Sequence, residues 1–212
     1  MREALDVSVG VAGLPGVVTI PAAPRGIVIF AHGSGSSRLS PRNVYAATKL
    51  QDEGFATLLF DLLTQDESRD RRNVFDVELL SARVIEAIEF IAADARTATL
   101  PIGLFGASTG AAAALRAAAE RPERVLAVVS RGGRPDLAGA ALPIVRAPTL
   151  LIVGGDDREV FQLNETARRA MRCEVELVVV PGAGHLFEEP GALDEALLAA
   201  GDWFVRHVRG GQ

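Results

Sequence analysis

The chain has 212 residues, of which 49% are hydrophobic and 5% aromatic, and its net charge is −5 at neutral pH. This size and composition predict one compact domain over residues 1–212. The acidic balance and the absence of a basic stripe argue against a nucleic-acid partner, and no apolar run reaches the length of a transmembrane helix.

Cysteine and histidine are scarce, which limits the cofactor chemistry. Cys173 has no partner for an internal disulfide, and three histidines offer few ligands for a zinc cluster. The first residues, 1–6, lack the apolar core of a signal peptide. We therefore expect a soluble cytoplasmic protein, a monomer or a homodimer, without membrane contact and without a metal or another cofactor.

Eight apolar runs predict strands. The first two flank a turn signal at residues 13–16 and predict an antiparallel hairpin at one edge. The later runs are continuously apolar, as in strands buried on both faces of a parallel sheet. The expected strands span roughly residues 4–11, 16–21, 26–31, 55–60, 100–105, 125–130, 148–153 and 174–180.

Helical patterns separate the later runs. Ser40 and Pro41 are typical of a helix start, as N-cap and first helical residue. Apolar residues at spacings of three and four over residues 77–91 predict a longer amphipathic helix. The mixed charges of residues 66–72 predict a solvated loop. Further helices are expected at roughly 109–121, 159–171 and 192–207.

A G-x-S-x-G pattern over residues 106–110 lies between an apolar run and an alanine-rich helical stretch. This strand–turn–helix context indicates a nucleophile elbow. The sharp turn would strain the backbone of Ser108 and present its hydroxyl at a helix N-terminus, whose dipole favours developing negative charge. We therefore predict that Ser108 is a nucleophile; the alternative is a serine that only caps the following helix.

Acidic and histidine residues follow two later runs. Asp156 and Asp157 come after the run at 148–153, and His185 comes after the last run. The carboxyl ends of parallel strands meet at one edge of a sheet, where active sites form. His185 would accept the Ser108 proton and return it to the leaving group. Either aspartate can supply the orienting carboxylate, and Asp136 is a distant third candidate.

The other two histidines are weaker candidates for the base. His207 lies near the end of the chain among arginines and is expected at the surface. His32 precedes Gly33 on the loop after the third run, where a histidine more often makes structural hydrogen bonds. Elimination therefore favours His185.

These motifs together resemble the α/β-hydrolase superfamily and, within it, the small lidless serine hydrolases similar to dienelactone hydrolase. The resemblance covers nearly the whole chain and also rests on residues 30–35 (FAHGSG) and 59–61 (LFD), each at the end of a run. It implies an α/β fold with a mostly parallel eight-stranded sheet, helices on both faces and no cap domain. Residues 131–147, between the sixth and seventh runs, leave room only for a loop and a helical turn.

The resemblance also assigns roles to residues. The G-x-x-D spacing of the family places the acid at Asp157, which would leave Asp156 to cap the next helix. The oxyanion hole would use the backbone N–H groups of Ser34 and Thr109. Dienelactone hydrolases commonly have a cysteine nucleophile, and this chain has Ser108 instead. The resemblance therefore implies acyl transfer but does not extend to the dienelactone substrate. The rival interpretation of residues 33–37, a phosphate cradle, lacks a third glycine and a P-loop lysine.

Four arginines lie near these motifs. Arg131 and Arg134, after the sixth run, are candidate contacts for an anionic substrate group, as are Arg38 and Arg42 beside the oxyanion loop. The favoured alternative is that these arginines pair with neighbouring carboxylates at the surface.

The sequence thus predicts an enzyme that cleaves a small-molecule carboxylic ester or thioester through an acyl-enzyme, using a Ser-His-Asp triad. Two other functions remain open. One is a hydrolase-fold protein that binds a ligand without turnover. The other is a perhydrolase or a C–C bond hydrolase that uses the same triad.

Overall fold

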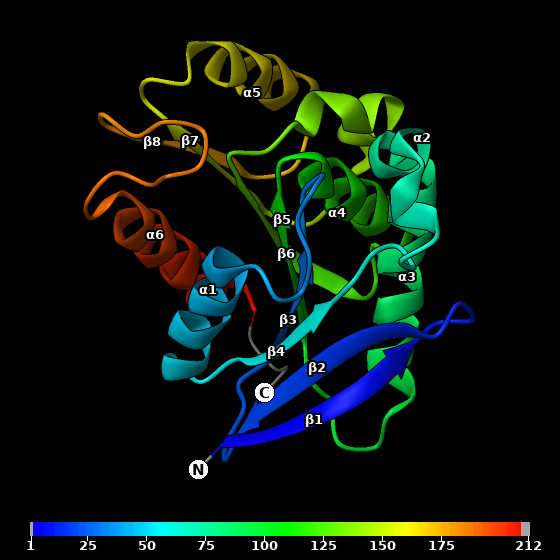
Figure 1. The fold of residues 1–212 in the computed structure, drawn as a ribbon. Coiled ribbons are helices and arrows are strands. Elements are labelled where there is room, and N and C mark those ends of the chain that lie inside the picture. The colour runs from blue at the N-terminus through cyan, green and yellow to red at the C-terminus, as the bar shows by residue number, and fades with distance from the viewer. Residues whose placement is uncertain (1, 209–212) are drawn as a thin grey trace.

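An eight-stranded sheet forms the centre of this computed structural model, which describes residues 2–208. The strand order is β1-β2-β4-β3-β5-β6-β7-β8 (Figure 1). All eight predicted runs form strands, with ends shifted by at most two residues. The strands are β1 (Arg2–Val9), β2 (Leu14–Pro21), β3 (Ile27–Ala31), β4 (Ala56–Phe60), β5 (Ile102–Ala107), β6 (Val125–Arg131), β7 (Thr149–Gly154) and β8 (Val175–Val180).

The sheet is parallel except at one edge. β1 and β2 form the expected antiparallel hairpin, and β2 also pairs antiparallel with β4. The pairs from β4 through β3, β5, β6 and β7 to β8 are parallel. The carboxyl ends of these parallel strands therefore lie along one edge of the sheet, where the predicted site residues follow.

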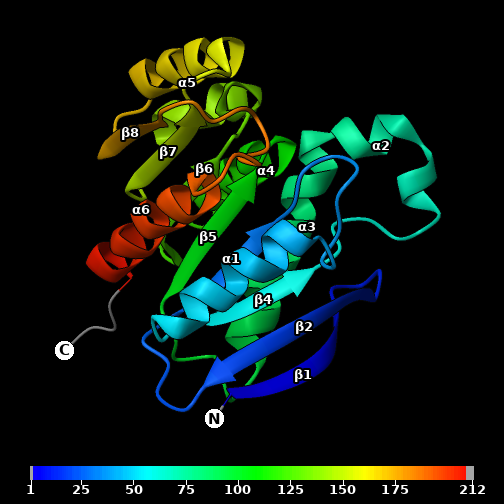
Figure 2. The ribbon, with the colours of Figure 1, turned by 60° about the vertical axis from the view of Figure 1, so that its left-hand side comes forward.

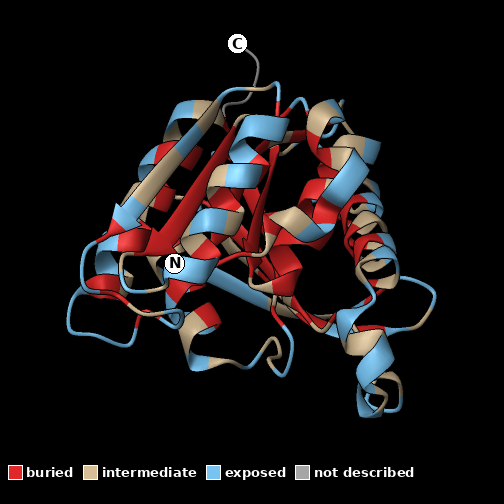
Figure 3. Ribbon diagram, turned by 90° about the horizontal axis from the view of Figure 1, so that it is seen from above, coloured by how far each residue is buried: buried red, intermediate tan, exposed pale blue. Residues whose placement is uncertain are grey.

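Helices cover both faces of the sheet (Figure 2). α1 (Pro41–Asp52) and α6 (Ala192–His207) pack on one face, and α3 (Val77–Ala93), α4 (Thr109–Glu120) and α5 (Arg158–Ala170) pack on the other. Neighbouring residues of β3 point to opposite cores: Ile29 joins the α3–α4 side, and Phe30 joins the α1–α6 side. The strands are buried between the layers, while the helices expose their outer faces (Figure 3).

The segment between β4 and α3 differs from the predicted solvated loop. It contains a 3₁₀ turn, η1 (Glu67–Arg69), and a short helix, α2 (Arg71–Phe75). A capping box starts it, because the Thr64 amide donates to Glu67 Oε2 and the Glu67 amide donates to Thr64 Oγ1. Asp70 then caps α2 by accepting from the Arg72 amide. The mixed charges therefore form local hydrogen bonds that fold the segment.

The segment between β6 and β7 is short, as expected, and adds no cap domain. It forms one 3₁₀ stretch, η2 (Pro135–Ile144), which packs against α4 and α5. Within residues 2–208, no helix is both long and apolar enough to cross a membrane.

Candidate active site

Ser108 lies in a sharp turn between β5 and α4. Its backbone has φ 50° and ψ −125°, a conformation that residues with side chains rarely adopt. A Cβ at Gly106 would lie 2.8 Å from the Ala111 nitrogen, and one at Gly110 would lie 2.5 Å from the His32 carbonyl oxygen. Both glycines of the pattern are therefore required sterically. The Ser108 side chain makes no capping hydrogen bond to α4, so the alternative of a purely capping serine is wrong.

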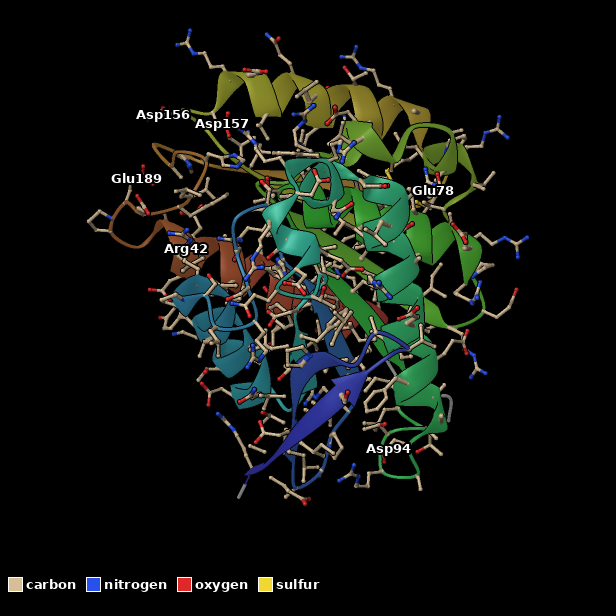
Figure 4. All side chains as sticks on the ribbon, turned by 45° about the vertical axis from the view of Figure 1, so that its right-hand side comes forward. Arg42, Glu78, Asp94, Asp156, Asp157 and Glu189 are labelled. Atoms are coloured by element: carbon tan, nitrogen blue, oxygen red, sulfur yellow. The ribbon has the colours of Figure 1, made fainter. Side chains whose placement is uncertain are left out.

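His185 and Asp157 form a hydrogen-bonded pair. Asp157 follows β7, and its Oδ2 lies 2.7 Å from Nδ1 of His185. Its Oδ1 also accepts from the Val160 amide at 3.4 Å, which makes Asp157 the N-cap of α5. The expectation that Asp156 caps this helix is wrong, because Asp157 holds the N-cap position. Figure 4 shows both aspartates at the same end of the molecule.

Ser108 and His185 line the same pocket, which has a volume of about 630 Å³. The glycine- and serine-rich loop of residues 33–37 forms one wall, and Arg131 and the start of α1 complete it. A second pocket, of about 550 Å³, lies against the same loop. Thr109 and several residues between Asp61 and Val74 line it. The loop thus contributes to both cavities.

Ser34 and Thr109, the two predicted oxyanion donors, lie next to each other. The Ser34 amide donates to Thr109 Oγ1 at 3.1 Å, so this N–H already has a partner. Thr109 is the first residue of α4, and its own N–H has no acceptor within the helix. A Cβ at Gly33 would lie 2.8 Å from the Ser108 Cβ, so only glycine allows the loop to approach Ser108 this closely.

His32 holds this loop in place. The Leu62 amide donates to its Nε2 at 3.0 Å, and its Nδ1 lies 3.0 Å from the Gly33 carbonyl oxygen. Because an amide can only donate, the ring proton belongs on Nδ1. Burial lowers the pKa of His32, and the Gly33 hydrogen bond and the Asp61 charge oppose this shift only in part. His32 therefore makes the structural hydrogen bonds expected from the sequence.

The structure separates Arg131, the last residue of β6, from Arg134 in the segment that follows. Arg131 lines the pocket with Ser108 and His185. Arg134 instead donates from Nε and Nη2 to the Asp136 carboxylate, at 2.9 and 2.8 Å, and does not line the pocket. Only its backbone touches the elbow, where its amide donates to the Ser108 carbonyl at 3.0 Å. The pairing with Arg134 also occupies Asp136, the third candidate for the acid.

Two residues that pack beside this site were not predicted. The Phe187 ring lies 5.7 Å from the Arg131 guanidinium, and buried Asn164 donates to the Gly133 carbonyl at 3.0 Å. No sequence motif points to Phe187. Asn164 could have been found from the sequence, because it lies on the apolar side of α5 between Val160 and Ala167. His207 is only partly at the surface: its side chain is 13% exposed and packs on Trp203. Within residues 2–208, no group of three metal-ligating side chains gathers.

Comparisons with known proteins agree with this architecture. The family model of the dienelactone hydrolase family matches residues 14–205. Dienelactone hydrolase from Anabaena variabilis is 54% identical, with a TM-score of 0.94 over 99% of each chain. A cold-adapted esterase from an Arctic intertidal metagenomic library shares the fold, with a TM-score of 0.77 at 18% identity, over 98% of this chain and 94% of that one.

Two curated relatives come from two strains of Mycobacterium tuberculosis and have the provisional name phosphoribosyl transferase. Each is 57% identical over 208 residues, which are 98% of this chain and 47% of the relative. The chain thus spans about half the length of these relatives. With the family model matching nearly all of its length, the chain belongs to the dienelactone hydrolase family.

Proposed function

We propose that the chain is a serine hydrolase that cleaves a carboxylic ester or thioester through an acyl-enzyme. The observation that carries the proposal is the His185–Asp157 pair, at 2.7 Å, beside the pocket that Ser108 also lines. Because Asp157 accepts from Nδ1, the lone pair of His185 Nε2 remains free to act as a base. The strained elbow presents the Ser108 hydroxyl at the N-terminus of α4.

The reaction then has two balanced halves. His185 takes the Ser108 proton while Oγ bonds to the acyl carbon, and the protonated ring gives that proton to the departing alkoxide or thiolate as its bond to carbon breaks. In the second half, His185 takes a proton from water, whose oxygen attacks the acyl-enzyme. The carboxylic acid leaves, and Ser108 recovers its proton.

The oxyanion formed in each half would be bound at the start of α4. The N–H of Thr109, which has no acceptor within α4, is one donor. The Ser34 amide is the second, and it becomes available when the Thr109 hydroxyl, its present acceptor, rotates away. We propose that substrate binding replaces this internal hydrogen bond.

The name of the mycobacterial relatives does not change this proposal. It describes proteins of which this chain matches 47%. The dienelactone hydrolase family model covers residues 14–205, which lie within the shared part. We therefore assign hydrolysis to this segment and leave phosphoribosyl transfer to the longer proteins as a whole.

Hydrolysis of p-nitrophenyl acetate, butyrate and octanoate by the wild type and by Ser108→Ala tests the proposal, with fluorophosphonate labelling in parallel. We expect turnover and labelling that both disappear in Ser108→Ala. Labelling without turnover would keep the nucleophile and direct the search to thioesters, peracids and C–C bonds. The absence of both signals in folded protein would contradict the proposal and favour a binding protein.

A further inference from the structure

The segment of residues 184–191, which carries His185 and leads to α6, reaches the core at one residue only. Phe187 is 2% exposed, whereas every other residue of this segment is exposed or half-buried. Figure 4 shows Glu189, two positions further on, at the outside of the molecule. The single buried side chain of the segment thus lies two residues after the proposed base.

The Phe187 ring ties this segment to the end of β6. It belongs to the core on the α1–α6 side of the sheet. A Cβ at Gly132 would lie 3.2 Å from the ring and 2.9 Å from the His185 carbonyl oxygen, so glycine allows both to approach. The Arg131 guanidinium lies 5.7 Å from the ring centroid, within range of a cation–π contact. The ring is therefore held by the strand next to the one that leads into Ser108.

The backbone of Phe187 is also unusual. Its φ is 55°, and among residues 2–208 the only other non-glycine residue with a positive φ is Ser108. A bulky residue adopts this conformation at a cost, and it persists where the surrounding structure fixes it, most often at active sites. The Phe187 amide donates to the Gly184 carbonyl at 3.3 Å, which closes a turn with His185 and Leu186 at its centre. The positive φ thus lies at the exit of the turn that presents His185.

The backbone on the two sides of the proposed base is held differently. On the amino-terminal side, the Asp156 amide donates to the Ala183 carbonyl at 3.0 Å and ties the chain to the end of β7. On the other side, the ion pair between Arg42 and Glu188 lies at the surface, where such pairs contribute little. The buried ring of Phe187 is therefore the main anchor on the side of α6.

The His185 ring itself has few contacts that could replace this anchor. Its side chain is 40% exposed, and in the described part of the chain Asp157 is the one side chain that shares a hydrogen bond with it. The direction of Nε2 thus depends on the backbone of the turn as well as on Asp157.

We propose that Phe187 is a positioning residue: its buried ring and its positive φ fix the turn of residues 184–187 so that His185 faces both Ser108 and Asp157. The inference rests on the proposed hydrolase function. Phe187 does not line the pocket that Ser108 and His185 share, so we expect its effect in kcat rather than in KM. A displacement of a catalytic group by about 1 Å can lower a rate by about 10²-fold.

The kinetic test removes the ring and keeps an apolar side chain. We expect Phe187→Leu and Phe187→Met to lower kcat for p-nitrophenyl butyrate by about 10- to 100-fold, with KM within about twofold of wild type. Phe187→Tyr keeps the ring and should retain most of the wild-type kcat.

Phe204→Leu is the matched control. Phe204 is a buried aromatic residue of the same core, but it lies on α6 and packs against Gly103 near the start of β5. We expect it to lose as much stability in urea as Phe187→Leu while it keeps the wild-type kcat. Equal values of kcat in the two leucine variants, whether both high or both low, would reduce Phe187 to a core residue and overturn the inference.

A measurement without turnover separates this inference from the proposed function. Proton NMR follows the downfield signal of the N–H between His185 Nδ1 and Asp157 in the inactive variant Ser108→Ala. Adding Phe204→Leu should leave this signal sharp, whereas adding Phe187→Leu should broaden it by exchange with water. The same signal in both double variants would overturn the positioning role. A difference between them, in a protein that hydrolyses no ester and takes no label, would overturn only the proposed function.

Discussion

Ser108 meets two demands that conflict at a single residue. Its φ of 50° and ψ of −125° belong to a region that glycine adopts readily and other residues adopt at a cost of about 1–3 kcal/mol. The side chain nevertheless has to be present, because the proposed chemistry takes place at its hydroxyl. The strain is therefore expected to appear as a loss of stability that can be measured separately from activity.

Replacing Ser108 by glycine should release this strain. We expect Ser108→Gly to be about 1–3 kcal/mol more stable than Ser108→Ala, since alanine keeps the Cβ that makes the conformation unfavourable. Urea denaturation of both variants measures the difference, and both should lack esterase activity. Equal stabilities would show that the turn is not strained in this way.

The two adjacent aspartates allow a matched test of the orienting carboxylate. Asp157→Asn should lower kcat/KM by about 10³–10⁴-fold, because an amide cannot hold His185 in the tautomer that leaves Nε2 as the base. Asparagine is as good an N-cap as aspartate, so α5 should remain intact. Asp156→Asn should stay within about twofold of wild type. A larger loss in Asp156→Asn than in Asp157→Asn would transfer the role to Asp156.

Among single residues, the strand ends of the sequence predicted that Ser108, His185 and either Asp156 or Asp157 lie at one edge of the sheet, and the resemblance to the family selected Asp157. The sequence could not distinguish Arg131, at the end of β6, from Arg134, three residues later. What separates them is the partner in space: Asp136 neutralises Arg134, while β6 carries Arg131 into the pocket. The Arg134–Asp136 pair is local, two residues apart, whereas the place of Arg131 in the pocket depends on tertiary contacts that no local pattern encodes.

The strand–turn–helix unit around Ser108 depends on close backbone packing. α4 crosses the end of β3 so closely that a Cβ at Gly110 would meet the carbonyl groups of Ala31 and His32. Those carbonyl groups belong to the sheet and to the loop that carries Ser34, so they cannot move without disturbing the site. Glycine here is a packing requirement of the element rather than a property of the turn alone.

A pair of helical glycines tests this requirement. Gly110→Ala should destabilise the protein by about 1–3 kcal/mol or more, although alanine is the better helix former. Gly201→Ala in α6 is the control, because the Cβ there would meet only the movable carboxylate of Glu53. We expect Gly201→Ala to be neutral or to stabilise by up to about 1 kcal/mol. Thermal unfolding of the two variants checks the sign, and equal effects would contradict the packing argument.

Across the whole molecule, the strand order along the chain and both helical layers could be predicted because buried parallel strands are continuously apolar. The prediction of a loop between β4 and α3 overlooked the T-x-x-E spacing of Thr64 and Glu67, a capping-box signal that the sequence carries. Only the pairing of Glu67 with Arg83 joins residues distant in the sequence. The mixed charges of residues 66–72 predict a solvated loop, but in the structure they form ion pairs. The hydrogen bond from the Ser34 amide to the Thr109 hydroxyl could not be predicted either, because it joins residues 75 positions apart.

His32 links the stability of the whole molecule to pH. Its folded-state pKa is below the ordinary value because the ring is buried, whereas the unfolded chain takes up a proton near the usual pH of about 6.5. Below that pH, the unfolded state binds more protons than the folded state. The contribution of neutral His32 to stability is therefore complete above about pH 6.5 and is lost as the pH falls toward the folded-state pKa.

His32→Gln isolates this contribution, because glutamine can accept from the Leu62 amide and donate to Gly33 without titrating. We expect the free energy of unfolding of the wild type to fall between pH 7 and pH 5 more steeply than that of His32→Gln, by at most about 1.4 kcal/mol per pH unit. Guanidinium denaturation at closely spaced pH values measures both slopes, and the other two histidines cancel in the comparison. Parallel slopes would mean that His32 does not stay neutral as the folded protein is acidified, and the hydrogen bond from the Leu62 amide would then not hold the loop of residues 33–37 in place.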